Sequence, residues 1–375
     1  MTPYDRHPEV SLPVSPVAEG FVAPLQVTLH GVTTAYPPYR FSQSEIASKA
    51  CQVFGHRSGL MDRMAATFQN SGVRHRNSCV PLEWYEHPHG WPERMRLFEE
   101  NALALLTDAG ERAMQAAGVA PREIAATVTV SSTGIATPSL DSLLQGPLGL
   151  SPTVQRLPVF GLGCGGGVIG LARAAAMARA NPGRWVLFLC TELCGLTFRR
   201  SDDTKANIIG TTIFGDGAAA MLVRTASADA AASEVTVDAW GEHTWPDTRD
   251  IMGWRIEDDG LGVVFSRDIP TLVKERMKAA SDEFLAGAGV AQSDLDGYLV
   301  HPGGEKVVSA IEEVYGLPPG GLKTARDILS ERGNMSAVTV LAVLERAIAE
   351  GARGRHLMSA LGPGFSAGFA LLTLR

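Results

Sequence analysis

One cysteine in the sequence lies in a turn that suits covalent catalysis. Cys164 follows a short apolar run and precedes an alanine-rich helical pattern, with glycines at positions 161, 163, 165, 166 and 167. A thiol at the N-terminus of a helix faces the positive end of the helix dipole, which lowers its pKa. Flanking glycines let a substrate carbonyl reach the sulfur and free backbone N–H groups as oxyanion donors. We therefore interpret Cys164 as a nucleophile rather than as a buried structural cysteine.

Two further glycine turns carry polar side chains. His301 follows the apolar run 298–300 and precedes Gly303 and Gly304, where a helical pattern begins. Asn334 lies at the start of another helical pattern, a place where asparagine is a common N-cap. A single histidine is also more often a core or surface residue than a catalytic one. Cys, His and Asn on three strand-to-helix turns nevertheless supply a nucleophile, a base and an amide donor, so we predict one active site from them.

The same glycines fit an alternative from another class of enzyme. Gly161-x-Gly163-x-x-Gly166 matches the dinucleotide fingerprint, and Glu192 ends the next strand, where a ribose-binding acid is expected. An NAD-dependent oxidoreductase would use both features. It would leave Cys164 and everything after residue 230 without a role.

Metal sites and several partners are not expected. His87 and His89 lack a third ligand at suitable spacing, and Cys190 and Cys194 lack the second pair of a zinc site. The chain has 375 residues and a net charge of −7 without a basic run, which excludes the usual nucleic-acid binder. No apolar stretch approaches about 18 residues, the N-terminus does not resemble a signal peptide, and five cysteines are scattered. We expect a reduced, cytoplasmic protein without a transmembrane segment.

Apolar runs and helical patterns alternate along most of the chain. Helical spacing over 98–119 and 165–180 is interleaved with strand patterns at 124–132, 154–163 and 184–192. Continuous apolar strands between helices favour a sheet covered on both faces. The surplus glycines, 40 in all, are expected where the backbone approaches substrate.

The chain is expected to contain two related halves. Residues 1–24 contain scattered prolines and no periodicity, which predicts a loosely ordered arm. Gly-x-Gly turns at 212–223 and 359–374 look like the same closing hairpin used twice. We therefore predict an N-terminal half over 25–230, carrying the cysteine, and a C-terminal half over 231–375, carrying the histidine and the asparagine.

These motifs resemble those of the type III polyketide synthases, the chalcone and stilbene synthase group of the thiolase superfamily. The resemblance runs from about residue 25 to the C-terminus and rests on GLGCGGG around Cys164, FGDGAAA at 214–220, HPGG at 301–304, GNMSA at 333–337 and GPGF at 362–365. It implies an α/β protein with a five-layered αβαβα thiolase-like fold made of two similar halves. It also implies a homodimer without a metal or redox cofactor. A catalytically inactive subunit would lack one of the three proposed catalytic residues, and all three are present.

The resemblance implies a reaction. Cys164 would take an acyl group from a CoA thioester, and malonyl-CoA would then lose CO₂ to give an enolate held by His301 and Asn334. The enolate would attack the Cys164 thioester in a Claisen condensation, and the longer chain would be loaded again for further extension.

Further site residues follow only from the resemblance. Phe214 and Phe265 match two aromatic gatekeepers between the CoA tunnel and the elongation cavity. Matching cavity positions are Ser132, Cys194, Thr197, Ile256 and Ser336. Ile256 is bulkier than the glycine usual in plant chalcone synthases, and Thr137 replaces a methionine that there reaches into the partner's cavity. For binding CoA we nominate Arg57, Arg63, Gly303, Gly304 and Lys306.

The subgroup is predicted from two segments. TGIATPSLD at 133–141 and VFGLGCGGGVIGL at 159–171 look most like bacterial alkylpyrone and alkylresorcinol synthases, which accept fatty acyl-CoA starters. Cys194 also fits bacterial tetrahydroxynaphthalene synthases, which start from malonyl-CoA, and that remains the alternative.

Overall fold

The computed structural model describes residues 25–54, 60–227 and 235–375, without the side chains of 60–64. Nine strands form the main sheet in the order β11-β12-β13-β8-β1-β7-β6-β4-β5. In chain order they are β1 (Gln26–Ala35), β4 (Ile124–Ser131), β5 (Gln155–Phe160), β6 (Trp185–Leu193), β7 (Asp216–Ala226), β8 (Val235–Thr244), β11 (Gly297–Val300), β12 (Gly354–Gly362) and β13 (Ser366–Leu374). β4 runs parallel to β5 and β6, and β11 runs parallel to β12, whereas the other neighbours are antiparallel.

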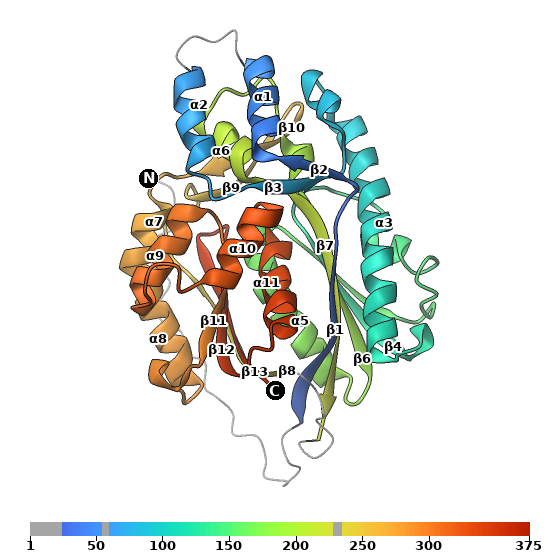
Figure 1. Ribbon diagram of the computed structural model, residues 1–375. Coiled ribbons are helices and arrows are strands. Elements are labelled where there is room, and N and C mark those ends of the chain that lie inside the picture. Colours follow the sequence, from blue (N-terminus) through green and yellow to red (C-terminus); the bar gives the residue numbers. More distant parts are fainter. Residues whose placement is uncertain (1–24, 55–59, 228–234) are drawn as a thin grey trace, which may run out of the picture.

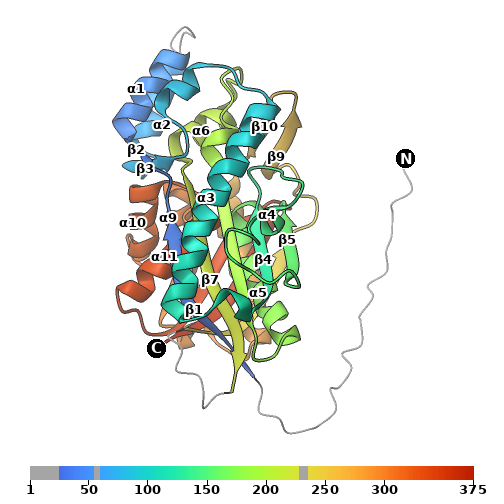
Figure 2. The same ribbon diagram turned by 90° about the vertical axis from the view of Figure 1, so that its right-hand side faces the viewer.

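Helices cover both sections of this sheet and fill the space between them (Figure 1). α5 (Gly166–Ala180) and α11 (Ala337–Ala349) lie between the β4–β7 section and the β8–β13 section. α3 (Trp91–Ala117) packs on the outer face of the first section, where Figure 2 shows it lengthwise, and α8 (Lys278–Gly287) packs on that of the second. The five layers therefore alternate as αβαβα, as the resemblance implies.

The sequence of each helix matches its layer. α3 buries one stripe at helical spacing, which includes Phe98, Ala102, Leu105 and Ala109, and exposes its other face to solvent. α5 is apolar almost all round because sheets and α11 surround it. Its sequence is therefore typical of a buried central helix.

The glycines at the start of α5 serve close packing. A Cβ built on Gly167 would lie 2.3 Å from the carbonyl oxygen of Ala337 in α11, and one on Gly170 would lie 2.6 Å from a methyl group of Val130. Any larger residue would push α5 away from its neighbours. Our expectation that the surplus glycines meet substrate is therefore wrong for these two positions.

A smaller group of elements sits above the sheet in Figure 1. It contains α1 (Gln43–Phe54), α2 (Leu60–Gln69), α6 (Lys205–Ile213), the pair β2 (Tyr39–Ser42) and β3 (His75–Ser78), and the hairpin of β9 (Met252–Glu257) and β10 (Gly260–Phe265). The remaining helices are α4 (Leu140–Leu143), α7 (Ile269–Leu272), α9 (Glu305–Tyr315) and α10 (Lys323–Arg332). α1, α2 and α6 share a small apolar cluster that includes Ile46, Phe54, Phe68 and Ile208.

Only one of the two predicted closing hairpins is a hairpin. Residues 359–374 form the antiparallel pair β12–β13. Residues 212–223 instead contain the end of α6 and the start of β7, so Gly215 lies in a helix-to-strand turn and Gly217 is the second residue of β7. Local sequence does not distinguish the two because a Gly-x-Gly turn suits either connection.

Candidate active site

Cys164, His301 and Asn334 come together from three separate turns. Cys164 lies in the 3₁₀ turn Gly163–Gly165 before α5, His301 follows β11, and Asn334 separates α10 from α11. All three line one cavity of about 450 Å³. Each is buried, with exposed fractions of 7%, 5% and 1%. The fold therefore places a thiol, an imidazole and a carboxamide around one space.

Backbone and side-chain hydrogen bonds fix the amide of Asn334. Its Nδ2 donates to the carbonyl of Gly303 at 3.1 Å, and its Oδ1 accepts from the amide of Ser336 at 2.8 Å. Its main chain pairs with the segment around Phe214 in an isolated parallel bridge, through bonds of 2.7 Å to Ile213 and 3.0 Å from Gly215. One Nδ2 proton is left over for a ligand in the cavity.

His301 is neutral and its ring nitrogens are free. Burial lowers the pKa of the imidazole to about 3, because no charged neighbour compensates for the lost hydration. Neither Nδ1 nor Nε2 has a hydrogen-bond partner among the residues that the structure describes. Since buried polar atoms are normally bonded, a ligand in the cavity is the natural partner of this ring.

The expected lowering of the Cys164 pKa is wrong. Burial, with a smaller contribution from the nearby Glu192 carboxyl, raises the pKa of this thiol to about 12, although hydrogen bonds from Ser336 and Asn334 lower it. The cost of burying a thiolate therefore exceeds what a helix N-terminus supplies. Cys164 and His301 are both neutral at pH 7, so the thiol of Cys164 must lose its proton when it acts as a nucleophile.

A buried carboxyl next to the site was assigned a different role from sequence. Oε2 of Glu192 accepts from the amide of Ser132 at 3.0 Å and from Oγ1 of Thr133 at 2.8 Å, and Oε1 accepts from Oγ of Ser336 at 3.3 Å. These bonds face the interior beside Cys164, so Glu192 does not sit where a ribose would bind. The feature of the sequence that points to Glu192 is a single acidic residue at the end of the apolar strand 185–193.

Glu192 makes the stability of the protein depend on pH. Burial raises its pKa from 4.5 to about 7, so between these values the native carboxyl keeps a proton that the unfolded chain has lost. The contribution of this carboxyl to stability is therefore full below about pH 4.5 and is lost as the pH rises through about 7. We expect Glu192→Gln, which has no such proton, to reduce the loss of unfolding free energy between pH 5 and 7.5 by about 2 kcal/mol. Urea unfolding of both proteins at the two pH values measures this, and equal losses would contradict it.

Two phenylalanines separate the catalytic cavity from the rest of the interior. The rings of Phe214 and Phe265 lie with centroids 5.7 Å apart, and with Cys164 they line a small cavity of about 20 Å³. Phe265 also borders the large cavity, and Phe214 borders a third, apolar cavity of about 60 Å³ under α1. Arg76 holds the chain at Phe214 by donating to its carbonyl at 2.9 Å. The three cavities therefore lie in series, with Cys164 and the two rings at their junctions.

Most of the predicted cavity residues lie near this series. Cys194 and Thr197 line the apolar cavity, and Ser336 lines the small one. Ser132 lies next to the turn of Cys164, because its Oγ accepts a hydrogen bond from the amide of Gly163 at 2.9 Å. Thr137 is exposed in the loop before α4 and lines none of these three cavities.

The assignment of Ile256 to the cavity wall is wrong. Its side chain is 77% exposed near the tip of the β9–β10 hairpin. The hairpin register pairs Phe265 with Met252, so residues 252–254 form the wall instead. Trp254 fills much of that space, with its ring centroid 6.1 Å from that of Phe214. The assignment rested on the resemblance, which matches positions along the chain, whereas Ile256 lies four residues beyond Met252 toward the tip of the hairpin.

The mouth of the large cavity carries positive charge. Gly303, Gly304 and Lys306 line it, as nominated, together with two cations that sequence reasoning missed, Lys205 and Arg267. Arg57 and the side chain of Arg63 lie outside the described residues. No motif marks Lys205 or Arg267, because only the fold brings α6 and the segment after β10 to the same rim.

One of the two histidines that resembled a metal pair is otherwise engaged. His89 bonds Glu93 through Nδ1 at 2.8 Å and the carbonyl of Trp84 through Nε2 at 2.7 Å. The part of the chain that the structure describes contains no group of three potential ligands that could hold a metal ion. Within the same ranges, no helix is long and apolar enough to cross a membrane.

Family models and known structures match this architecture and this site. The model for the N-terminal domain of chalcone and stilbene synthases matches residues 82–227, and that for their C-terminal domain matches residues 239–372. The chain therefore belongs to the chalcone and stilbene synthase family. It is a type III polyketide synthase, an acyltransferase-type enzyme that forms carbon–carbon bonds by decarboxylative condensation.

Its relatives include bacterial enzymes of more than one kind. A putative chalcone synthase of Bacillus subtilis (strain 168) is 37% identical over 91% of this chain and 97% of the relative. A 1,3,6,8-tetrahydroxynaphthalene synthase of Streptomyces peucetius subsp. caesius is 36% identical over 91% of each. The alpha-pyrone synthesis protein Pks18 of Mycobacterium tuberculosis is 27% identical over 90% of this chain and 88% of the relative.

The predicted fold class is confirmed. The crystal structure of 1,3,6,8-tetrahydroxynaphthalene synthase from Streptomyces coelicolor A3(2) superposes with a TM-score of 0.87, at 26% identity, over 93% of this chain and 99% of that one. Membership of this family also selects the polyketide synthase hypothesis over the NAD-dependent oxidoreductase.

Proposed function

We propose that the enzyme loads a fatty acyl group from acyl-CoA onto Cys164, extends it with malonyl-CoA, and cyclises the product to an alkylpyrone or alkylresorcinol. The observation that carries this proposal is the series of three cavities with Cys164 at the first junction. A charged mouth suits CoA, and the apolar cavity beyond Phe214 suits a hydrocarbon chain. Product analysis after incubation with malonyl-CoA and a panel of starter thioesters tests it.

Loading begins with the two neutral catalytic groups. The thiol proton of Cys164 passes to His301 as the sulfur attacks the thioester carbonyl, whose oxygen accepts a hydrogen bond from Nδ2 of Asn334. The tetrahedral intermediate collapses, the carbon–sulfur bond to CoA breaks, and the imidazolium returns its proton to the CoA thiolate. The acyl-enzyme is then a neutral thioester, which removes the cost of a buried thiolate.

Extension uses the same donors a second time. Malonyl-CoA loses CO₂, and the electron pair of the broken bond forms an enolate whose oxygen is held by His301 and Asn334. The enolate carbon attacks the Cys164 thioester, the new carbon–carbon bond forms, and the cysteine sulfur leaves. The lengthened chain, now on CoA, returns to Cys164 for another round.

Cations at the cavity mouth suit the phosphates of CoA. Lys205, Arg267 and Lys306 lie on that rim, and each can pair with a phosphate oxygen. Arg57 and Arg63 remain nominated from sequence alone.

The apolar cavity under α1 gives a test of the starter. Its apolar lining includes Ile46, Ala50, Val53, Leu82 and Phe198. We expect Ala50→Phe to fill this cavity and raise KM for a long-chain acyl-CoA about tenfold, because burial of several methylenes is lost, while KM for a short-chain starter stays within about twofold. Steady-state kinetics with both starters measures the change. Ala47→Phe, on the same helix but outside that lining, is the control, and an equal effect of Ala50→Phe on both starters would contradict the assignment.

The malonyl-primed alternative has its own support. Cys194 lines the apolar cavity, and the Streptomyces peucetius relative bears the name of a tetrahydroxynaphthalene synthase. An enzyme of that kind would make product from malonyl-CoA alone and would be indifferent to Ala50→Phe. The starter panel therefore separates the two hypotheses.

We also propose a cytoplasmic homodimer of two similar halves, 25–230 and 231–375. All five cysteines carry free thiols, which suits a reducing compartment. The large apolar side chains of Ile135, Phe160 and Ile256 are exposed, and a partner subunit would shield such groups from water. Light scattering of the purified protein tests the dimer.

A further inference from the structure

The hairpin that carries Phe265 is not part of the main sheet. Within the described ranges β9 and β10 pair only with each other, so main-chain hydrogen bonds to a neighbouring strand do not fix their position. This hairpin supplies Met252, Trp254, Val263 and Phe265 to the wall of the small cavity. Isolated two-stranded hairpins are marginally stable, so other contacts must hold this wall in place.

The base of the hairpin is tied by its own chain. The amide of Ser266 donates to the carbonyl of Ile251 at 2.8 Å, which closes the two strands where they leave the body of the protein. The tip is the two-residue turn Asp258-Asp259, and Asp259 is six residues before Phe265. A hairpin held only at its base would pivot, and movement of its tip would move the wall.

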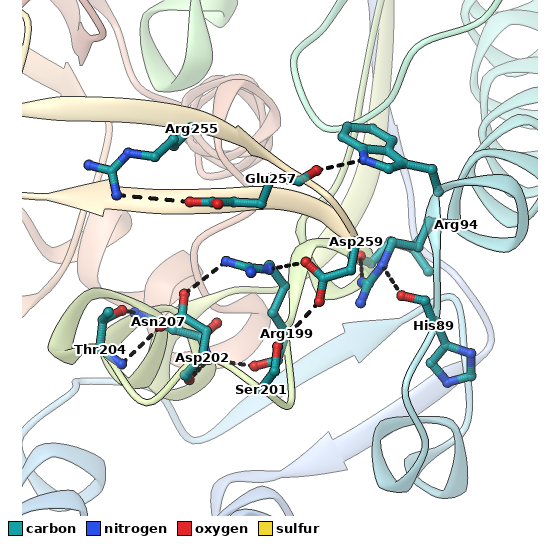
Figure 3. Close-up of polar contacts among 12 residues, drawn as sticks. His89, Arg94, Arg199, Ser201, Asp202, Thr204, Asn207, Arg255, Glu257 and Asp259 are labelled. Carbon is teal, nitrogen blue, oxygen red and sulfur yellow. Dashed lines mark hydrogen bonds and ion pairs between the residues drawn. The ribbon is translucent and has the colours of Figure 1, made fainter.

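An ion pair holds the tip. Oδ1 of Asp259 lies 2.6 Å from Nε of Arg199, and Oδ2 accepts from Oγ of Ser201 at 3.3 Å (Figure 3). The carbonyl of Glu257 also accepts from Nε1 of Trp91 at 2.8 Å. The Arg199 side chain is 15% exposed and that of Asp259 is 37% exposed, so this pair is partly shielded from water, unlike fully exposed surface ion pairs, which contribute little.

Arg199 in turn belongs to the segment that begins α6. Its carbonyl accepts from Nδ2 of Asn207 at 2.9 Å, and its Nη1 lies 3.3 Å from Oδ2 of Asp202 (Figure 3). Asn207 is in the first turn of α6, and the helix ends at Ile213, directly before Phe214. The element that presents Phe214 and the hairpin that presents Phe265 therefore meet at Arg199 and Asp259.

We propose that Asp259, through its ion pair with Arg199, is a positioning residue that sets the separation of Phe214 and Phe265, and thereby the number of extension units in the product. It lines none of the three cavities and does not touch the reacting atoms. This inference rests on the iterative extension described under Proposed function. A hairpin released at its tip enlarges the small cavity, so a chain with one more extension unit fits before cyclisation.

The test compares a variant of Asp259 with a control variant of Arg255, another charged residue on the same hairpin. In Asp259→Ala we expect hydrogen–deuterium exchange over 252–265 to become about tenfold faster, and the ratio of tetraketide to triketide products to rise at least about threefold. CO₂ release from malonyl-CoA stays within about twofold, because Cys164, His301 and Asn334 are untouched. Arg255→Ala is the control, since among the described residues the ion pair of Arg255 stays within β9, at 3.9 Å from Glu257 (Figure 3).

Two more variants keep the result interpretable. Asp259→Glu retains the charge and should give the wild-type product ratio. If the alanine variant does not fold, the isosteric Asp259→Asn takes its place and should shift the ratio in the direction expected for alanine. A ratio within about 1.5-fold of wild type in a folded Asp259 variant, or the same shift in Arg255→Ala, overturns the proposal. Absence of any polyketide from the wild-type enzyme would instead contradict the proposed function, and the exchange measurement would still report on the hairpin.

Discussion

Cys164→Ala is expected to lose acyl transfer completely while it continues to release CO₂ from malonyl-CoA. The acyl group has no other buried thiol at the junction of the large and small cavities, so product formation should fall by at least about 10⁴-fold. Decarboxylation needs only donors for the enolate oxygen, and we propose His301 and Asn334 for this role. Intact-protein mass spectrometry with a fatty acyl-CoA should show the acyl mass on the wild type and not on the variant.

The control for this experiment is the exposed thiol. Cys51 is the one exposed cysteine among the five, so it is the site at which an acyl-CoA would react without catalysis. Cys51→Ala should keep the adduct and the product. A stable adduct on Cys164→Ala, or no adduct on the wild type with any acyl-CoA, would remove Cys164 from the mechanism.

His301→Ala and Asn334→Ala are each expected to slow decarboxylation of malonyl-CoA by about 10²–10³-fold. Each variant removes one donor to the enolate oxygen, and a single oxyanion donor is typically worth that factor. The Asn334 variant keeps the main-chain bonds to Ile213 and Gly215, so Phe214 stays in place and the loss reports on the amide itself. Release of labelled CO₂ from malonyl-CoA, with acyl-CoA omitted, measures the step.

A histidine engaged elsewhere provides the comparison. His89 is stacked on Trp84 and bonded on both nitrogens, so His89→Ala should leave decarboxylation within about twofold of wild type. Near-normal release of CO₂ from both the His301 and the Asn334 variants would exclude them from the site.

Sequence reasoning located the residues that local chain geometry controls. The turns of Cys164, His301 and Asn334 each connect adjacent elements, so residue type and spacing were sufficient to single them out. Properties that depend on distant parts of the chain were not accessible. Ile256 was misplaced because hairpin register decides which residue faces Phe265, and Lys205 and Arg267 share a rim only after folding.

The prediction that the pKa of Cys164 is lowered was wrong for a related reason. A helix N-terminus is visible in a sequence, whereas the burial that raises the pKa to about 12 results from the packing of the whole molecule. The role of the glycines in α5 also depends on distant parts of the chain. They look like a substrate-facing turn, yet Gly167 owes its place to the carbonyl of Ala337, which lies far along the chain.

The main-chain bridge between Phe214 and Asn334 bears on the redesign of product length. The two residues share a β-bridge, so exchange of Phe214 for a residue that shifts its backbone also displaces the carboxamide that we propose as a donor to the enolate. Library variants at that position will trade turnover for altered products. Phe265 stands on a hairpin with no such link, and substitutions there can alter the size of the product at little cost in rate.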